Sequence, residues 1–328
     1  MTTMSQARQS EAAAHTGTRN TPIRYRGRFA PSPTGPLHFG SLVAAVGSYL
    51  DARHHGGEWL LRIEDLDPPR EVAGATAAIL RTLEGFGMHW DGPVIYQSRR
   101  GDIHATALEE LAHKDYLYGC ACTRKEIADS AIRSEAGLVY PGTCRGGLPP
   151  GRRARALRVR SEQRRIEMVD RLQGTMQQQL DREVGDFIIR RADGLIAYQL
   201  AVVVDDADQQ ITHVVRGADL LDSTPRQLYL QQLLELPTPS YLHLPVAVDA
   251  DAEKLSKQTF ARDVIAGRDN AALLDVLGFL NQQLPDSPLD ASRDELWQWA
   301  IKHWEPGRIS GSRTLPAPAA YSAKITKD

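Results

Sequence analysis

RFAPSPTGPLHFGS occupies residues 28–41 and is the segment that decides the fold. Apolar and basic residues alternate over residues 23–30, and a proline- and glycine-rich stretch follows, which predicts a short strand entering a rigid loop. From residue 42 the apolar side chains take helical spacing, with Gly56 and Gly57 as the expected stop. A strand, a loop and a helix N-terminus in this order form a phosphate-binding arrangement in an open parallel sheet.

Two side chains of this loop have a chemical use. His38 is a candidate to donate a hydrogen bond to a phosphate oxygen as charge builds in a transition state. Gly40 lets an adenine ring lie close to the backbone. The alternative that these residues alone leave open is an ordinary strand-to-helix turn with a packed histidine.

A second segment, KLSKQ at residues 254–258, indicates what chemistry the first segment supports. A strand is predicted over residues 242–248, and the polar turn 249–253 then delivers Lys254 and Lys257 three residues apart. Lysine is a flexible point charge that can follow a departing pyrophosphate. A solvated lysine turn is the alternative for this segment alone, but together the two segments favour adenylate formation from ATP.

As a pair, these segments resemble the two signature motifs of class I aminoacyl-tRNA synthetases, in the glutamyl and glutaminyl branch. The resemblance continues through residues 61–70, 197–206 and 215–220, so it covers roughly residues 26–261, which is most of the chain. It implies an α/β fold with a Rossmann-type catalytic domain and an ATP-dependent ligase that uses Mg²⁺ with ATP. The implied catalytic residues are His38, Lys254 and Lys257, and the implied ATP-binding residues are His38, Gly40, Ser41 and Lys257. Ser41 replaces the second histidine of many class I enzymes, and Gln258 replaces a serine.

The amino-acid substrate is expected to be L-glutamate. Free glutamate presents two carboxylates and one ammonium group, and Arg28, Arg216 and Glu64 supply two bidentate cations and one anion. The resemblance implies a glutamate-binding set of Arg28, Phe29, Ala30, Pro31, Ser32, Glu64, Tyr198 and Arg216. We expect Arg216 to bind the side-chain carboxylate. The alternative for Glu64 and its acidic neighbours is a solvated turn or a divalent-ion site.

All three cysteines, Cys120, Cys122 and Cys144, fall close together in the sequence, which favours a metal site over a disulfide in a cytosolic protein. Zinc takes four ligands, and His113, Glu126 and Tyr140 are candidates for the fourth. The spacing Cys-x-Cys followed by Tyr140-x-x-x-Cys144 resembles the zinc site of one branch of the family, in which the phenolic oxygen completes the shell. One structural Zn²⁺ per chain is therefore expected, with a metal-free insertion of buried thiols as the alternative.

The composition describes a globular protein with 42% hydrophobic residues and a net charge of −2, so RNA contacts would come from local patches such as residues 145–165. No apolar stretch is long enough for a membrane span. The predicted organisation is a disordered tail (1–22), the first half of the catalytic domain (23–117), an inserted α/β subdomain that binds zinc and the acceptor RNA (118–192), the second catalytic half (193–261) and a short helical C-terminal region (262–328). Within it, a hairpin is expected at 187–197, helices at 225–236 and 271–284, and a frayed end at 316–328.

Only residues 258–328 follow Lys257, and we expect no anticodon-binding domain there. The chain resembles a shortened branch of the family that activates glutamate with ATP and transfers it to the queuosine at the wobble position of tRNA(Asp). This resemblance implies tRNA-independent activation, binding of the tRNA(Asp) anticodon stem-loop and a cytoplasmic monomer. The alternatives are a truncated glutamyl-tRNA synthetase that charges a tRNA 3′ end, a non-catalytic tRNA-binding paralogue, and a nucleotidyltransferase that makes a small-molecule adenylate.

Overall fold

A parallel sheet lies at the centre of the computed structural model, which describes residues 24–134, 137–148, 150–255, 270–287 and 290–322. Strand β1 (Arg26–Phe29) pairs with β2 (Glu58–Ile63), and β2 pairs with β3 (Ile95–Tyr96), all in parallel. Strand β11 (His213–Gly217) pairs in parallel with β12 (Ser240–Leu244). A hydrogen bond of 2.9 Å from the amide of Thr212 to the carbonyl of Arg26 places β11 beside β1. The resulting order is β3-β2-β1-β11-β12.

The direction in which successive strands are added to the sheet reverses between β1 and β11, although the strands themselves are parallel. Helix α1 (Phe39–His54) connects β1 to β2, whereas α7 (Thr224–Leu233) connects β11 to β12 on the other side. In such open sheets the crevice beyond the carboxyl ends of the strands at this switch point is where ligands bind. The expected α/β fold is confirmed at this level.

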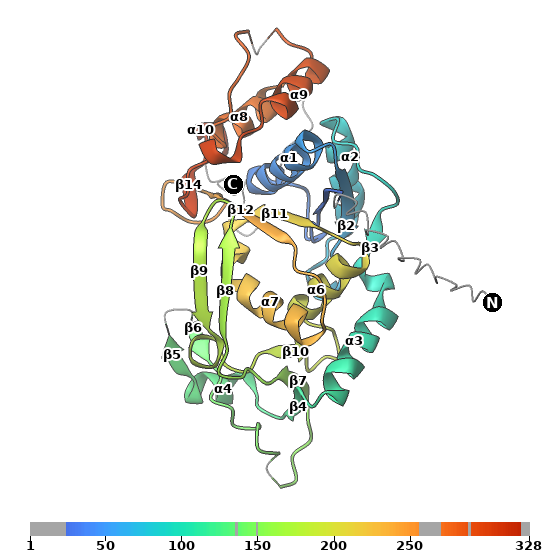
Figure 1. Ribbon diagram of the computed structural model, residues 1–328, viewed down its shortest axis with the longest axis vertical. Helices are drawn as coiled ribbons and strands as arrows, with labels where there is room; N and C mark the ends of the chain where they lie inside the picture. The colour runs from blue at the N-terminus through green and yellow to red at the C-terminus, as the bar shows by residue number, and fades with distance from the viewer. Residues whose placement is uncertain (1–23, 135–136, 149, 256–269, 288–289, 323–328) are drawn as a thin grey trace, which may run out of the picture.

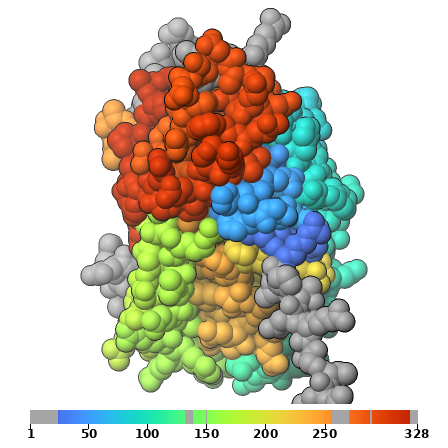
Figure 2. Space-filling model, turned by 45° about the horizontal axis from the view of Figure 1, so that its top comes forward, coloured from blue at the N-terminus to red at the C-terminus, as the bar shows by residue number. Residues whose placement is uncertain are grey.

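Helix α1 is buried along most of its length because the sheet covers one side and the C-terminal helices cover the other. Helices α8 (Ala271–Phe279) and α9 (Arg293–Lys302) pack on it, and the space-filling view shows this C-terminal region over the blue α1 (Figure 2). On the sheet side, Gly47 permits close contact, since a Cβ there would lie 2.5 Å from Cδ1 of Leu244.

The remaining elements of the catalytic region flank the sheet. They are α2 (Ala75–Gly85), α3 (Gly101–His113), α6 (Tyr198–Asp208) and the short 3-10 turns η1 (Pro68–Arg70), η2 (Gln97–Arg99) and η3 (Ala218–Ser223). A further 3-10 turn, η5 (Pro306–Arg308), lies in the C-terminal region. Helices α6 and α7 pack on one another and share a second group of buried apolar side chains with α3.

The segment that lies in the sequence between the two halves of the sheet forms a separate layer at the lower end of the molecule (Figure 1). Its antiparallel sheet has the order β10-β7-β4, and α4, α5 and the β5–β6 hairpin lie nearby. Their bounds are β4 (Leu117–Cys120), α4 (Arg124–Ser130), β5 (Ile132–Ser134), β6 (Gly137–Val139), β7 (Ala156–Val159), α5 (Leu180–Glu183) and β10 (Ile188–Arg190).

A long hairpin leads from this layer back to the central sheet. It consists of β8 (Arg165–Asp170) and β9 (Gly174–Gln179), and Asp170 pairs with Tyr241 of β12. The hairpin therefore brings the end of β8 to the strand that borders the switch point.

Several details differ from the expectations. The predicted strand 242–248 is two strands, β12 and β13 (Val246–Val248), because Pro245 interrupts the pairing. The hairpin at 187–197 turns at Gly194, whose φ is +88°, but its second arm is only a bridge between Arg190 and Ile196. The helices predicted at 225–236 and 271–284 are confirmed as α7 and α8, which end earlier.

The predicted frayed end is wrong for residues 316–322. Strand β14 (Thr314–Pro316) pairs in parallel with β13, and α10 (Ala319–Ser322) follows. The pairing provides hydrogen-bond partners for the backbone groups at the edge of β13, which explains why β14 is ordered. Residues 323–328 and the predicted tail 1–22 lie outside the described residues, and the proposed domain boundaries stay predictions.

Candidate active site

A cavity of about 780 Å³ opens beyond the carboxyl ends of β1, β2 and β11, at the switch point of the sheet. It gathers residues that lie far apart in the sequence. The predicted site residues that line it are Arg28, Phe29, Ala30, Pro31, Ser32, His38, Gly40, Ser41, Glu64, Tyr198, Arg216 and Lys254. Lys257, the second lysine of the motif, lies outside the described residues.

The N-terminus of α1 borders this cavity. His38 is its N-cap residue, and the His38 Nδ1 accepts a hydrogen bond of 3.3 Å from the amide of Ser41. The Ser41 hydroxyl lies 2.9 Å from Nε2 of the same ring. A Cβ on Gly40 would lie 3.3 Å from the His38 ring, so the absence of a side chain at Gly40 leaves room for this ring. The helix dipole and the first amides make this end of the cavity favourable for phosphate.

Arg216, at the end of β11, is a buried cation held by neutral partners. Its Nε lies 3.0 Å from Nε2 of His243, and its Nη2 donates bonds of 2.8 Å to Thr224 and to Gln227. Its Nη1 has no hydrogen-bond partner among the described residues although it is shielded from water. An arginine that is 5% exposed and pairs with no carboxylate of the described residues can bind an anion that enters the cavity.

Arg28 differs from Arg216 because it already has an acidic partner. Its Nε and Nη2 donate to the carboxylate of Asp206 over 3.2 and 3.3 Å. The same carboxylate lies 2.8 Å from Nη1 of Arg62, which is fully buried. The Nη2 of Arg62 in turn donates to Glu64 over 3.2 Å. Two arginines and two carboxylates thus form one buried network beside the cavity.

Glu64 follows β2 and is the acidic group of this network that lines the cavity. Burial raises the pKa of Glu64, and the nearby Arg62 and Arg28 guanidinium groups offset part of that rise. An ammonium group brought next to Glu64 would favour its ionised form. Glu64 therefore lies where the cation of an amino acid can be bound.

The lysine turn borders the cavity close to the N-terminus of α1, since a Cβ on Gly40 would lie 3.7 Å from the carbonyl oxygen of Leu255. Asp249 organises the turn, because its carboxylate accepts from the amides of Asp251 and Glu253. Lys254 then lies with its Nζ 2.5 Å from Oδ2 of Asp219. The first lysine is therefore placed at the cavity and paired with an acidic side chain.

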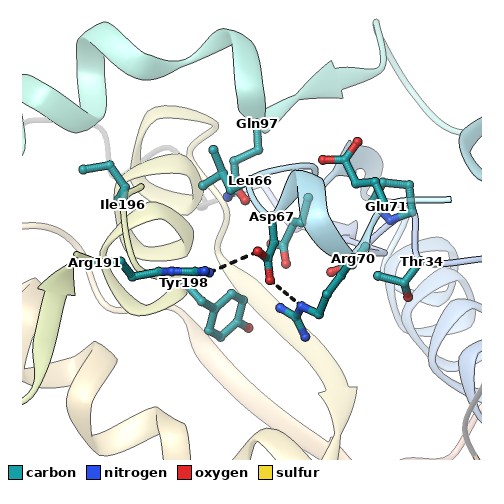
Figure 3. A pocket seen from close by; sticks show the side chains of 12 residues that line it. Thr34, Leu66, Asp67, Arg70, Glu71, Gln97, Arg191, Ile196 and Tyr198 are labelled. Carbon is teal, nitrogen blue, oxygen red and sulfur yellow. Dashed lines mark hydrogen bonds and ion pairs between the residues drawn. The ribbon is translucent and has the colours of Figure 1, made fainter. Parts of the chain in front are cut away.

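A smaller hollow of about 70 Å³ adjoins the cavity and shares Ser32, Thr34, Glu64 and Tyr198 with it. Figure 3 shows Asp67 at its centre, between Arg191 and Arg70. The Oδ1 of Asp67 lies 3.2 Å from Nη1 of Arg191, and its Oδ2 accepts from Nε of Arg70. The pKa of Asp67 is lowered, mainly by the Arg70 hydrogen bond, so this hollow contains an ionised carboxylate.

The three cysteines converge in the inserted layer. Their sulfur atoms lie within 4.8 Å of one another, a group that can hold a metal ion. The Oη of Tyr140 lies 3.5 Å from the sulfur atoms of Cys120 and of Cys122, and it accepts a 3.0 Å bond from the amide of Cys144. Burial would raise the pKa of Cys120, but hydrogen bonds from Arg158 and Tyr140 lower it to about 7.

The other two candidates for a fourth ligand are placed less well. Glu126 forms a capping box with Thr123 and an ion pair of 2.7 Å with Arg152. His113 ends α3 and is not in the group of side chains that converge on the three thiols. Three sulfurs and one phenolic oxygen match the donor number of a closed zinc shell.

Sequence reasoning did not single out Arg62, Asp206, Asp219, Asp170 or His243. The first two lie inside the motifs quoted above, and a charged pair directly after the apolar run 202–204 was an available signal for a buried acidic residue. Asp219 also lies in a quoted motif. Asp170 and His243 carried no local signal, because only the packing of β8 against β12 brings them together behind Arg216.

The switch-point crevice, with its helix N-terminus, buried Arg216 and lysine turn, agrees with a class I aminoacyl-tRNA synthetase catalytic domain. The family described as tRNA synthetases class I (E and Q), catalytic domain, matches residues 24–268. The chain is 60% identical over 297 residues to Glutamyl-Q tRNA(Asp) synthetase of Dechloromonas aromatica, which covers 90% of this chain and 99% of the relative. It is 55% identical over 304 residues to the enzyme of that name from Aromatoleum aromaticum, covering 93% and 96%. The chain belongs to the glutamyl-Q tRNA(Asp) synthetase family.

A solved structure supports the same fold. The glutamate-tRNA synthetase of Elizabethkingia anophelis matches with a TM-score of 0.73 and 26% identity, over 90% of this chain and 68% of that chain. The expectation of a class I synthetase ligase is thereby confirmed. Among the described residues, no helix combines the length and apolarity needed to cross a bilayer.

Proposed function

We propose that this enzyme activates L-glutamate with ATP to glutamyl-adenylate and transfers the glutamyl group to the queuosine at the wobble position of tRNA(Asp). One observation carries the proposal for the amino acid: Arg216 is a buried cation without a carboxylate partner among the described residues, and it faces the same cavity as Glu64. A substrate with a side-chain carboxylate supplies the missing anion. The names of the relatives support the choice of acceptor.

In the first step the substrate is held by opposite charges. Arg216 binds the side-chain carboxylate, Glu64 binds the ammonium group, and Arg28 lies by the α-carboxylate, while Tyr198 and residues 29–32 complete the wall. This clamp directs the α-carboxylate toward the α-phosphorus of ATP. Because attack by a carboxylate needs no further activation, positioning and charge stabilisation supply most of the catalysis.

ATP lies at the α1 end of the cavity in this proposal. Gly40 and Ser41 border the nucleotide, His38 and the helix N-terminus stabilise charge on the phosphates, and Lys254 and Lys257 stabilise the departing pyrophosphate. Mg²⁺ would enter with ATP and would supply positive charge to the phosphates. Activation does not require tRNA in this scheme, because the groups that bind glutamate and ATP all belong to this chain.

In the second step a hydroxyl of the queuosine cyclopentene ring attacks the mixed anhydride, and AMP leaves. The new ester forms between this oxygen and the α-carbonyl carbon, while the bond from that carbon to the phosphate oxygen breaks. The small hollow around Asp67 adjoins the glutamate site away from the α1 N-terminus, so we assign the acceptor to it. A carboxylate there can accept a hydrogen bond from a hydroxyl group.

The inserted layer is proposed to hold one structural Zn²⁺ through Cys120, Cys122, Tyr140 and Cys144. A closed shell leaves no position for substrate, so the metal would only stabilise the layer. Next to it, Arg152, Arg153 and Arg155 are exposed, and we assign them to contacts with the phosphates of the anticodon stem-loop. Cysteines that form no disulfide suit the reducing cytoplasm, where we expect the protein to act as a monomer.

A second candidate function is the charging of a tRNA 3′ end. It is favoured by the structural match to the glutamate-tRNA synthetase of Elizabethkingia anophelis. The two functions share the activation step and differ only in the acceptor.

ATP–pyrophosphate exchange tests the shared step. The wild-type protein is expected to exchange pyrophosphate with L-glutamate and not with L-glutamine, in the absence of tRNA. Exchange that requires tRNA would overturn only the tRNA-independent step, whereas equal exchange with glutamine would overturn the assignment of Arg216. Nuclease mapping of labelled tRNA then separates the anticodon loop from the 3′ end as the site of transfer.

A further inference from the structure

Arg216 is held in place by a histidine whose own orientation is fixed from a distant part of the chain. His243 lies on β12 and is fully buried. Its Nδ1 lies 2.7 Å from Oδ2 of Asp170, and its Nε2 lies 3.0 Å from Nε of Arg216. Asp170, His243 and Arg216 thus form a row that ends at the cavity.

The chemistry of this row allows only one protonation state of the ring. A guanidinium group only donates, so Nε2 of His243 must be a lone-pair acceptor. The proton of the neutral ring then resides on Nδ1 and is donated to Asp170. Burial lowers the pKa of His243 below its ordinary value, which agrees with a neutral ring, while Asp170 offsets part of that shift.

Asp170 is itself fixed by the backbone. Its Oδ1 accepts from the amides of Leu172 and Gln173 over 2.9 and 2.8 Å, and its Oδ2 accepts from the amide of His243 over 3.1 Å. These bonds hold the carboxylate at the tip of the β8–β9 hairpin, so the imidazole has one available orientation.

We propose that His243, oriented by Asp170, is a positioning residue for substrate: its Nε2 fixes the Arg216 guanidinium so that Nη1 is left for the side-chain carboxylate of glutamate. The other donors of Arg216 are already committed, because Nη2 bonds Thr224 and Gln227. Binding of the acidic side chain therefore depends on a group that does not touch it. This inference rests on the proposed function, because it requires that glutamate is the ligand.

The row predicts a large effect for one change of this histidine and a small effect for another. His243→Leu removes the acceptor for Nε of Arg216, whereas His243→Gln retains an oxygen acceptor at the position of Nε2. Asp170→Asn is a third change, in which the amide oxygen keeps the bonds from Leu172 and Gln173. Its NH₂ group then donates to Nδ1 of His243, which moves the ring proton to Nε2 and opposes the Arg216 N–H.

Equilibrium binding of L-glutamate and of ATP to the full-length protein tests the row, with folding checked by circular dichroism. His243→Leu and Asp170→Asn are expected to weaken glutamate binding at least ~10-fold, as for one lost charge-assisted hydrogen bond, with ATP binding unchanged. His243→Gln is expected to bind glutamate within about 3-fold of wild type, as partial retention of that bond predicts. The control is His213→Leu, whose ring stacks on Tyr25 at 4.0 Å and which should leave glutamate binding unchanged.

Three results separate the possibilities. Equal glutamate affinity in wild type, His243→Leu and Asp170→Asn would overturn the positioning role and leave the proposed function intact. Equal loss of glutamate and ATP binding in the histidine variants, including His243→Gln, would also overturn it, since that pattern marks a purely structural role. A wild-type protein that binds ATP but no glutamate would overturn the proposed function itself.

Discussion

Arg28 and Asp206 lie 178 positions apart in the chain, and their side chains form a buried ion pair in which Nε is 3.2 Å from Oδ1. The pair joins β1 to α6, elements on either side of the insertion. Asp206 also binds Arg62, so one carboxylate fixes two cations beside the cavity. The two halves of the catalytic region are thus connected through the charges that shape the substrate site.

Asp206→Ala should destabilise the protein strongly, because it leaves the Arg28 and Arg62 guanidinium groups buried without this partner. The free energy of unfolding is expected to fall by about 3–5 kcal/mol, measured by urea denaturation. The matched control is Asp222→Ala, which breaks an exposed pair with Arg313 and should change stability by less than about 1 kcal/mol. Similar losses in both variants would contradict the buried network.

Glu64→Gln should weaken glutamate binding by about 2 kcal/mol, or about 30-fold, because the ammonium group loses a charged acceptor. Glu58→Gln, at the other end of β2, is the control and should have no effect. The measurement is the KM for glutamate in pyrophosphate exchange. An unchanged KM in Glu64→Gln would exclude Glu64 as the ammonium site.

The same carboxyl group predicts a pH dependence. Burial raises the pKa of Glu64, and the ammonium group binds only its ionised form. Glutamate affinity is therefore full above this raised pKa and falls as pH drops through it, at a pH above the ordinary value of about 4.3. Titration of glutamate binding against pH should show this acid limb in wild type and not in Glu64→Gln. A limb that persists unchanged in the variant would assign it to another group.

Lys257→Ala should slow activation at least ~10²-fold, as expected for the loss of one preorganised donor in the transition state. Lys254→Ala, which removes the partner of Asp219, provides the comparison within the same sequence motif. Pre-steady-state formation of glutamyl-adenylate measures both. A near wild-type rate in Lys257→Ala would remove this residue from the catalytic set.

Zinc content tests the cysteine cluster. Purified protein is expected to contain one zinc per chain, and chelation should lower its melting temperature. Cys144→Ser and Tyr140→Phe should each weaken zinc binding at least ~10-fold, the lower bound known for disturbing groups around a bound metal. His113→Ala should retain full zinc. Normal zinc affinity in Tyr140→Phe would mean that one of the other candidates, and not Tyr140, is the fourth ligand.

Local sequence features predicted the α/β fold and many of the residues that line the cavity, because these features are short-range. The alternation before residue 30, the proline-rich loop and the helical spacing of α1 each act within a few residues. The motif positions then converge because the carboxyl ends of β1, β2 and β11 meet at one edge of the sheet.

Long-range partners were not predictable in this way. The bond between Asp170 and His243 spans 73 positions and exists because a hairpin from the insertion docks on β12. The order of residues 314–316 likewise depends on pairing with β13, which the polar local sequence does not indicate. His243, the partner of Arg216, could not be predicted from the motif that contains Arg216, because the two residues lie on different strands.

The most direct test of the account is transfer of labelled glutamate to tRNA(Asp) that contains queuosine, beside the same tRNA without it, in the presence of ATP and Mg²⁺. The account predicts label only on the modified tRNA, in a nuclease fragment that contains the anticodon loop. Equal labelling of both tRNAs at the 3′ end would contradict it and identify a glutamate-tRNA ligase of the ordinary kind.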